Sequence, residues 1–395
     1  MRLLHSADWH LGARLYGQSR EAEQERFLDE LLTIIRREAV EGLLLAGDVF
    51  DSATPSLGAQ TLYYRFLARL LETPCRQTVI VAGNHDNPSF LQLPAGLLRA
   101  LHIHIVGRRG ELIALHDADG ETAALVAAVP YLRERELRTL RPEESPAEGE
   151  AALVAAVLNH YEELARAGLA KRGERDWPLL AMGHLFAAGG RTADDEAIRD
   201  LYVGKLGLIP AEKLPTAFDY IALGHLHRQQ RLSAPVPIYY SGAPLAYSFG
   251  EAEAPKGLLL LETEGRTVHV RPLALPGYQR LERLRGNAGE LLAALQARAD
   301  EDVWLEALHT GPGSAGTLYQ QLQRELEGRR AKLLRLQVPA AQLQSLNADE
   351  VPTLESLTPL EVFNLRLQRE ELNPAEADAL RARFLELLAQ AEAAE

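Results

Sequence analysis

The sequence predicts an α/β protein, because short apolar runs alternate with helix-forming segments over residues 1–275. Runs such as 42–46 and 78–81 have the length and composition of buried strands. Segments such as 20–38 place apolar residues at helical spacing. This alternation indicates a largely parallel central sheet, with functional loops at the carboxyl ends of its strands.

The first 277 residues contain most of the expected elements. Residues 133–150 are charged and contain two prolines, which predicts a helix fragment followed by a loop. Residues 257–263 and 267–273 form an expected hairpin. We expect other helices at 20–38, 57–72 and 150–168, and other strands at 2–5, 42–46, 78–81, 103–106, 112–115, 123–129, 178–182, 220–223 and 238–240.

The pattern changes after Pro276-Gly277, where we place a domain boundary at residue 277. Residues 278–340 predict a small α+β domain with the order strand, helix (287–299), strand (303–308), helix (315–328), strand (332–338). A linker, 341–358, and C-terminal helices within 359–395 follow, at about 359–371 and 375–394. The apolar positions of these helices need a cover, which is either the rest of this chain or a partner protein.

Composition limits the class of protein. The chain has 395 residues and a net charge of −13, which argues against coating nucleic acid through bulk positive potential. The single cysteine, Cys75, excludes an intrachain disulfide framework. No apolar run approaches the roughly 20 residues that span a bilayer. Met1 leads directly into a strand pattern, so we expect no signal peptide and a cytoplasmic protein.

Polar side chains follow five of the apolar runs, at the points where the predicted strands end. Because the strand ends of one parallel sheet lie side by side, we expect these residues to converge. Imidazoles, carboxylates and an amide oxygen suit Mn, Fe or Zn, and many oxygen ligands favour Mn. The residues are Asp8, His10, Asp48, Asn84, His85, His184, His225 and His227.

Their spacing suits a two-metal centre. Asp8 and His10 lie two residues apart, as do His225 and His227, so each pair shares one face of an extended segment. The carboxylate of Asp48 has two oxygens and can bridge two ions, which in such centres lie roughly 3.5–4 Å apart and serve phosphoryl displacement. A histidine left off the metals can protonate the departing oxygen.

Together, Asp8-x-His10, Gly47-Asp48, Gly83-Asn84-His85-Asp86, Gly183-His184 and Gly224-His225-Leu226-His227 resemble the motifs of calcineurin-like metallophosphoesterases. Longer matches resemble the bacterial SbcD exonuclease family, whose relatives are the Mre-type double-strand-break repair nucleases. These longer matching segments are Asp8-Trp9-His10-Leu11-Gly12, Gly47-Asp48-Val49-Phe50-Asp51, Tyr240-Ser241-Gly242-Ala243-Pro244 and Ser248-Phe249-Gly250-Glu251.

The resemblance implies a β-sandwich core flanked by helices, then a capping domain (278–340) and C-terminal helices. It implies two Mn²⁺ ions, with Mg²⁺, Zn²⁺ or Fe as alternatives. Asp48 would bridge them. His85 would be the proton donor, and Asp86 would pair with the other nitrogen of its ring. The ligands of one ion would be Asp8, His10, Asp48 and His227, and those of the other Asp48, Asn84, His184 and His225.

The same resemblance implies a DNA nuclease of repair, recombination and replication. Its activities would be a 3′→5′ exonuclease and an endonuclease at hairpins and blocked ends. The partners would be DNA, an SbcC-type ABC ATPase with a coiled coil, bound through 359–395, and a second copy in a homodimer at the nucleoid. Two alternatives stay open: another metallophosphoesterase (a phosphatase or cyclic-nucleotide phosphodiesterase), and a non-catalytic scaffold for the ATPase.

Several further residues carry weaker expectations. Arg14 and Tyr16 could reach substrate phosphate or belong to a solvated loop, and Asp51 could orient a metal ligand. Ser241 is expected to be a turn serine, not a nucleophile. The remaining candidates are His102 and His104, expected as a solvent-facing pair, and Cys75, expected as a buried or incidental thiol.

Overall fold

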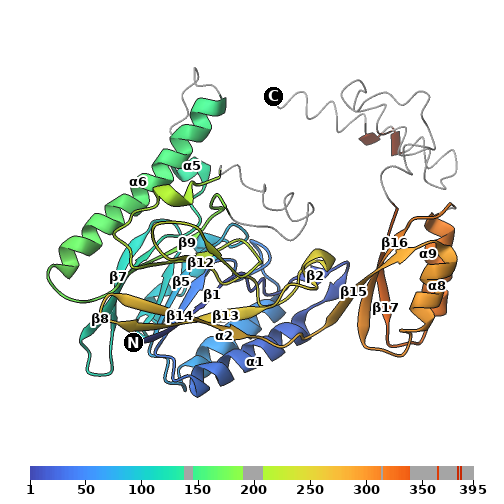
Figure 1. Cartoon of the computed structure of the whole chain (residues 1–395), viewed down its shortest axis with the longest axis horizontal. Helices are drawn as coiled ribbons and strands as arrows, with labels where there is room; N and C mark the ends of the chain where they lie inside the picture. The colour runs from blue at the N-terminus through green and yellow to red at the C-terminus, as the bar shows by residue number, and fades with distance from the viewer. Residues whose placement is uncertain are drawn as a thin grey trace.

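The computed structural model describes residues 1–137, 146–189, 208–312 and 315–338, together with Phe363, Leu380, Arg381, Arg383 and Phe384. Two six-stranded sheets pack face to face in the main body, and a three-stranded sheet forms a separate small domain (Figure 1). Helices cover the outer faces of the two large sheets (Figure 1).

The first sheet has the strand order β14-β13-β1-β4-β5-β6. Its parallel strands are β1 (Arg2–Ser6), β4 (Gly42–Ala46), β5 (Gln77–Val81) and β6 (Ile103–Val106). The hairpin of β13 (Gly257–Glu264) and β14 (Thr267–Ala274) adds an antiparallel edge. Helices α1 (Glu21–Arg37) and α2 (Leu57–Leu70) pack on its outer face. The apolar runs thus form the expected strands and helices.

The second sheet has the order β11-β12-β10-β9-β8-β7. Its parallel strands are β8 (Thr122–Ala128), β9 (Leu179–His184), β10 (Tyr220–Gly224) and β12 (Ile238–Tyr240). The edges are β7 (Glu111–His116) and β11 (Gln230–Leu232), both antiparallel. Helix α6 (Pro146–Arg172) covers the outer face, and the short α5 (Glu134–Leu137) precedes it.

Alternating side chains explain why the sheets pack in layers. Leu3 and Leu44 face the second sheet, whereas Leu4 and Leu43 face the helices. All five residues of β4 are buried, since both of its faces are covered. The expectation of one central sheet is wrong, because the parallel strands divide between two sheets. The β-sandwich flanked by helices is confirmed.

Short elements connect the long ones and were not expected from the sequence. They are β2 (Arg14–Leu15), β3 (Gln18–Ser19), α3 (Pro88–Gln92), α4 (Ala95–Arg99) and the 3-10 turns η1 (Ala211–Lys213) and η2 (Phe249–Glu251). Asn87 starts α3, because its side chain accepts from the Ser89 and Phe90 amides and Pro88 occupies the first turn. Helices of about one turn and strands of two residues are too short to show a periodic apolar pattern, and these elements lack the continuous apolar runs of the predicted strands.

The small domain has a parallel sheet of β15 (Arg280–Gly286), β16 (Val303–His309) and β17 (Lys332–Gln337). Helices α8 (Ala288–Gln296) and α9 (Ala315–Glu325) pack on the face turned away from the main body (Figure 1). The opposite face meets the main body, where Leu281 and Trp304 pack with Leu15 and Phe249. These elements follow the order expected for residues 278–340.

The predicted linker, 341–358, lies outside the described residues, as does most of the two helices expected within 359–395. Of these helices, Phe363 and Phe384 stack with their ring centroids 4.1 Å apart. Among the helices that the structure describes, none combines the length and apolar character needed to cross a bilayer.

Candidate metal centre

The polar residues that follow the strands converge, although they come from two sheets. Asp8, Asp48 and Asn84 follow β1, β4 and β5 of the first sheet. His184 ends β9, and His225 follows β10 of the second. The two sheets are joined directly, since the Asp8 carboxylate accepts a hydrogen bond from the His225 amide at 2.9 Å. The centre therefore lies across the carboxyl ends of both sheets.

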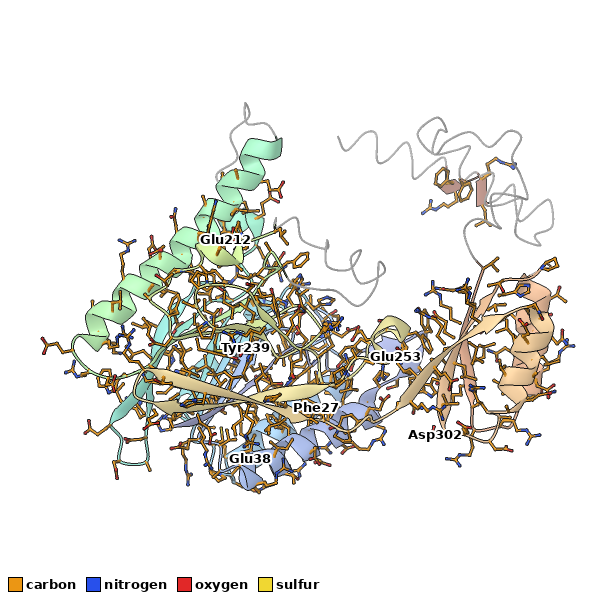
Figure 2. All side chains as sticks on the ribbon, in the orientation of Figure 1. Phe27, Glu38, Glu212, Tyr239, Glu253 and Asp302 are labelled. Carbon is orange, nitrogen blue, oxygen red and sulfur yellow. The ribbon has the colours of Figure 1, made fainter. Side chains whose placement is uncertain are left out.

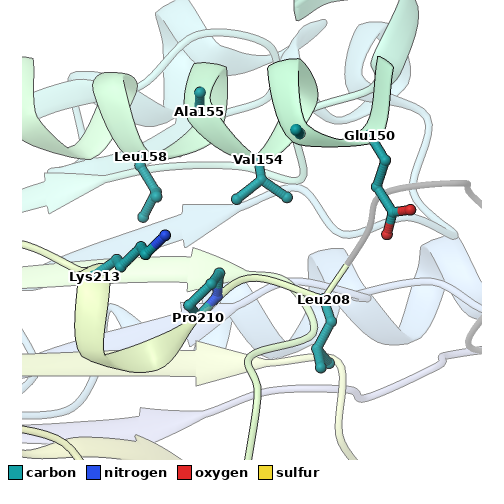
Figure 3. A pocket seen from close by; sticks show the side chains of 8 residues that line it. Glu150, Val154, Ala155, Leu158, Leu208, Pro210 and Lys213 are labelled. Carbon is teal, nitrogen blue, oxygen red and sulfur yellow. The ribbon is translucent and has the colours of Figure 1, made fainter. Parts of the chain in front are cut away.

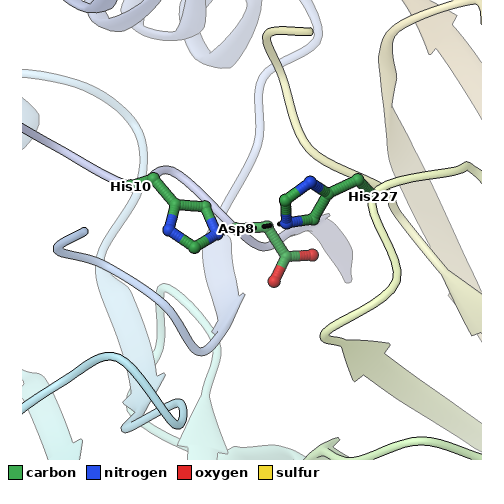
Figure 4. A group of neighbouring side chains, drawn as sticks. All are labelled: Asp8, His10 and His227. Carbon is green, nitrogen blue, oxygen red and sulfur yellow. Dashed lines mark hydrogen bonds between the residues drawn. The ribbon is translucent and has the colours of Figure 1, made fainter. Parts of the chain in front are cut away.

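One group of ligand atoms comes from Asp8, His10 and His227 (Figure 4). The Nε2 atoms of His10 and His227 lie 3.1 Å apart, turned toward each other. The Oδ2 atom of Asp8 is buried and has no hydrogen-bond partner. A buried carboxylate oxygen without a donor needs a cation or water to compensate its lost solvation. This arrangement fits a metal ion held by one oxygen and two imidazoles.

A second group, which includes Asp48 and His184, lies beside the first, and Asp8 is close to both. The Asn84 Oδ1 atom lies 2.9 Å from His184 Nε2 and 3.0 Å from His225 Nδ1. Asp48 Oδ2 lies 3.2 Å from His184 Nε2 and 3.6 Å from His10 Nε2. Asp48 thus lies between the two groups. The residues present fit divalent-metal binding, since every donor is an oxygen or an imidazole nitrogen.

The backbone is strained where these side chains leave it. Asp8, His10, Asp48 and His225 have φ angles of 55°, 43°, 49° and 102°. Side-chain-bearing residues avoid this region, at a cost of about 1–3 kcal/mol each. Four such residues at one site indicate that the surrounding fold holds the ligands in place against local preference.

Two glycines permit the close approach of the ligand segments. A Cβ atom on Gly83 would lie 2.1 Å from the Asp48 Oδ1 atom, and one on Gly224 would lie 1.9 Å from the Ala46 carbonyl oxygen. Any side chain at either position would push the ligand-bearing loops apart. This contact explains why glycine precedes both Asn84 and His225.

The carboxylates favour positive charge in the centre, although burial opposes it. Burial raises the pKa of Asp8, while the neighbouring His184 opposes the rise. Burial would lower the pKa of His10, but the carboxylates of Asp51 and Asp48 outweigh it and raise the value to about 9. Burial would raise the pKa of Asp48, yet His184 and His10 hold it below its ordinary value. The carboxylates therefore stabilise a cation placed among them.

The second ring nitrogens of the histidines are also held. His184 Nδ1 lies 2.9 Å from the Ala46 carbonyl oxygen, and His10 Nδ1 lies 3.3 Å from an Asp51 carboxylate oxygen. His227 Nδ1 lies 3.1 Å from Glu251 Oε1. Sequence reasoning missed this role of Glu251, because no spacing links it to His227. Its only signal was its place in the segment Ser248–Glu251.

His85 lies beside these groups, with its ring 4.8 Å from the His10 ring, centroid to centroid. Its Nδ1 atom lies 2.9 Å from the Asp51 carbonyl oxygen. The expected pairing of Asp86 with the His85 ring is wrong. The Asp86 carboxylate instead accepts from the backbone amides of Val49, Phe50 and Gly83, which ties the loop after β5 to the loop after β4.

Comparison with known proteins places this centre in a family. The family model described as calcineurin-like phosphoesterase matches residues 1–229. A second, described as the type 5 capsule protein repressor C-terminal domain (SbcD_C), matches residues 277–371. The SbcD subunit of the nuclease SbcCD from Escherichia coli K12 is 34% identical over 391 residues, which cover 97% of both chains. The chain belongs to the SbcD family.

Two further members of the SbcD family support this assignment. The SbcD subunit of the Rhodobacter capsulatus nuclease SbcCD is 40% identical over 319 residues, covering 76% of this chain and 77% of the relative. The Bacillus subtilis protein of the same name is 33% identical over 314 residues, covering 78% of each. The chain is therefore a metal-dependent phosphoesterase of the SbcD nuclease family.

The residues that carried weaker expectations lie at different positions in the structure. Arg14 is exposed and donates to the Gly17 carbonyl oxygen. The Tyr16 ring stacks on Phe249, and its hydroxyl accepts from Arg335 of the small domain. Ser241 is buried and its hydroxyl donates to the Gly242 carbonyl oxygen. His102 is exposed, His104 is half-buried instead of solvent-facing, and Cys75 is buried with a pKa raised to about 11 by burial.

A separate hollow of about 370 Å³ lies between α6 and the segment around η1 (Figure 3). Val154, Leu158, Leu208 and Pro210 supply most of its wall, with Glu150 and Lys213 at its margin. Among the described residues that line it there is no histidine and a single carboxylate, which do not make a metal-ligand set.

Proposed function

We propose that the chain is the nuclease subunit of an SbcCD-type complex, which hydrolyses DNA phosphodiesters with two divalent metal ions. The observation that carries this proposal is the pair of ligand groups that meet at Asp48, whose Oδ2 atom lies 3.2 Å from His184 Nε2 and 3.6 Å from His10 Nε2. The relatives are named as SbcD subunits of the nuclease SbcCD, and these names support a nuclease.

Two ions would be held by these ligand atoms, and Asp48 would be available to both. Asp8, His10 and His227 complete one set, and Asn84, His184 and His225 complete the other. We infer Mn²⁺ for both, because carboxylate, amide and imidazole donors are mixed and thiolates are absent from the described centre. Mg²⁺, Zn²⁺ and Fe²⁺ are the competing ions.

When bound, the ions supply positive charge for the scissile phosphate and lower the pKa of the attacking water. His85 acts as the proton donor to the departing oxygen. Its Nδ1 atom lies 2.9 Å from the Asp51 carbonyl oxygen, which can only accept, so Nδ1 donates there and Nε2 is the nitrogen left for proton transfer. Asp86 holds the loop that carries Asn84 and His85 through its three backbone hydrogen bonds.

The DNA activities proposed are a 3′→5′ exonuclease and an endonuclease at hairpins and blocked ends. A net charge of −13 requires local contacts to phosphate rather than a general positive surface. Tyr16 and Arg335 lie where the small domain meets the main body, and we assign the small domain to cap the bound DNA. Because the proposed substrate is chromosomal DNA, we infer that the protein acts at the nucleoid.

The proposed partners are an SbcC-type ABC ATPase and a second copy of this chain. We assign the ATPase contact to residues 359–395, since they combine apolar positions that need a cover with more acidic than basic residues. The homodimer contact is the exposed apolar patch of Leu57, Tyr64, Leu93 and Leu97 on α2 and the segment around α3 and α4. Aromatic contacts of Phe50 with Tyr63 and Phe90 join these segments.

A 5′-labelled DNA hairpin incubated with purified protein tests the proposal. We expect opening of the hairpin and shortening from the 3′ end with Mn²⁺, and no cleavage with a chelator. Asp48→Ala should lose metal and about 100-fold or more of the rate, the scale expected when charge stabilisation is removed. The matched control is Asp302→Ala in the small domain, where the aspartate is exposed (Figure 2).

Other results would contradict the proposal. Hydrolysis of p-nitrophenyl phosphate with intact DNA would show a small-ester phosphatase. Binding of the ATPase with neither activity would show a scaffold. Retention of two ions by Asp48→Ala would remove Asp48 as the bridge.

A further inference from the structure

We propose that Glu251 is a positioning residue that fixes His227 as a ligand of one of the two ions, so that this ion alone depends on it. The inference rests on the proposed two-ion centre and names a residue outside the predicted ligand set. It starts from the 3.1 Å distance between Glu251 Oε1 and His227 Nδ1.

The contact determines which nitrogen of His227 can bind metal. A carboxylate can only accept a hydrogen bond, so Nδ1 carries the proton and the lone pair is on Nε2. The Nε2 atom of His227 lies 3.1 Å from the Nε2 atom of His10 and belongs to the same ligand group as Asp8 (Figure 4). Glu251 thereby selects the metal-binding tautomer and restrains the ring.

Glu251 is built into the fold rather than placed at the surface. Only 4% of the residue is exposed. Its second oxygen accepts from Lys256 Nζ at 2.8 Å and from the Tyr247 amide at 3.3 Å, and the Ser248 hydroxyl donates to Oε1 at 3.3 Å. A buried carboxylate with this many donors is held as the charged form in one orientation.

Three histidines of the two ligand groups differ in the partner of their second ring nitrogen, Nδ1. Behind His184 is a backbone carbonyl, that of Ala46, which no side-chain substitution removes. Behind His10 is Asp51, whose side chain is 43% exposed. Of these three, His227 is the one whose second nitrogen lies within hydrogen-bond distance of a buried carboxylate. Removing the charge of Glu251 therefore affects the ion of Asp8, His10 and His227.

Glu251 also ends the turn through which the small domain contacts the main body. Phe249, two residues earlier, packs with Leu281 and Trp304 and stacks on Tyr16. The turn η2 thus carries the domain contact at one end and the His227 contact at the other.

The test is Mn²⁺ binding to the full-length protein, measured by calorimetry and by the electron paramagnetic resonance signal of paired ions. We expect wild type to bind two ions. Glu251→Gln should weaken one of them by about 10–100-fold, the usual effect of losing such a partner, and leave the other unchanged. At low Mn²⁺ the signal of paired ions should fall and return when Mn²⁺ is raised.

Glu253→Gln is the matched control, because Glu253 is exposed in the same segment (Figure 2) and should change neither ion. Glu251→Gln leaves Lys256 without a counter-charge, so Glu251→Gln/Lys256→Met is the second variant, which removes both charges and secures a folded protein. It should show the same loss at one ion.

The number of ions bound by wild type tests the proposed function, and the affinities of the Glu251 variants test the role of Glu251. If wild type binds fewer than two ions, the proposed two-ion function fails. If wild type binds two ions and both Glu251 variants bind two with wild-type affinity, the role of Glu251 is overturned while the proposed function stands. Equal weakening of both ions would also overturn it, because the inference assigns Glu251 to one.

Discussion

At the scale of single residues, the proposed ligands combine burial, backbone strain and close contact, which suits a bound cation. Asp8 and His10 are buried and have positive φ angles, and the Oδ2 atom of Asp8 has no hydrogen-bond partner. Gly83 and Gly224 are required by contact distances to Asp48 and Ala46. The residues that we propose orient the ligands, Glu251 among them, contact the histidine ring nitrogen that does not face the metal centre.

His85 gives the sharpest prediction at this scale. Its ring contacts His10 edge-on but is not one of the atoms that meet at Asp48. We expect His85→Ala to keep both ions and to lose about 10²–10⁴-fold of single-turnover DNA cleavage, the usual contribution of a general acid. Metal content by mass spectrometry and cleavage on the same sample measure the two effects.

His269→Ala is the matched control, because His269 is exposed on β14. Loss of metal from His85→Ala, with a wild-type rate once the metal is restored, would end the proton-donor role.

At the scale of elements, each sheet sets the position of several site residues by ending its parallel strands at one edge. The sheets then pack through residues such as Val79 and Met182, which are fully buried between them. On the outside, α2 and the segment around α3 and α4 keep Leu57, Leu93 and Leu97 exposed by 79%, 83% and 70%. Such exposure is unfavourable in a monomer, since burial of each leucine contributes about 1.5–3 kcal/mol.

We therefore expect Leu93→Glu/Leu97→Glu to convert a dimer into a monomer, measured by light scattering on a sizing column. The charges would have to be buried against their own copies in a symmetric contact, which is strongly unfavourable. Leu169→Glu is the control, because Leu169 is 42% exposed on α6, which covers the other sheet. A double variant with the mass of the wild-type dimer would move the interface elsewhere.

At the scale of the whole molecule, the metal centre links two sheets, and the small domain contacts the main body through one compact cluster. Trp304 lies in that cluster and under the Arg20 guanidinium, 5.5 Å from its ring centroid. All proposed ligands lie between residues 8 and 227, far in sequence from the C-terminal residues. Metal chemistry and partner binding are thus assigned to separate parts of the chain.

Deletion of residues 359–395 tests this separation. We expect the shortened chain to lose its ATPase in co-purification. Its rate of Mn²⁺-dependent cleavage of simple DNA should stay within about 3-fold of wild type, which is less than the tenfold change that about 1.36 kcal/mol of activation free energy would cause. A chain lacking only 391–395, which is mostly alanine and glutamate, is the control. If the long deletion still co-purifies with the ATPase, the partner contact lies elsewhere.

Much of the fold was predictable because its elements are long and strongly patterned. The strand at 42–46 and the hairpin ending near Ala274 appear where expected, and α1 differs from the expected 20–38 by one residue at each end. The short α3 and η2 were missed, since a helix of about one turn is too short to show helical periodicity. The strand pattern alone did not divide the strands between two sheets, because an apolar run looks the same in either; the family resemblance supplied the β-sandwich.

The sequence by itself determined which residue types stand at the strand ends, and with them the metal chemistry and the family. Repeated Gly-plus-ligand endings are local, so they are readable along the chain. Only the tertiary structure decided that Asp86 binds backbone amides instead of the His85 ring, and that Glu251 stands behind His227. The physical reason is that a hydrogen bond depends on distance in space. Glu251 lies 24 positions after His227, and no sequence pattern predicts a contact between residues so far apart in the chain.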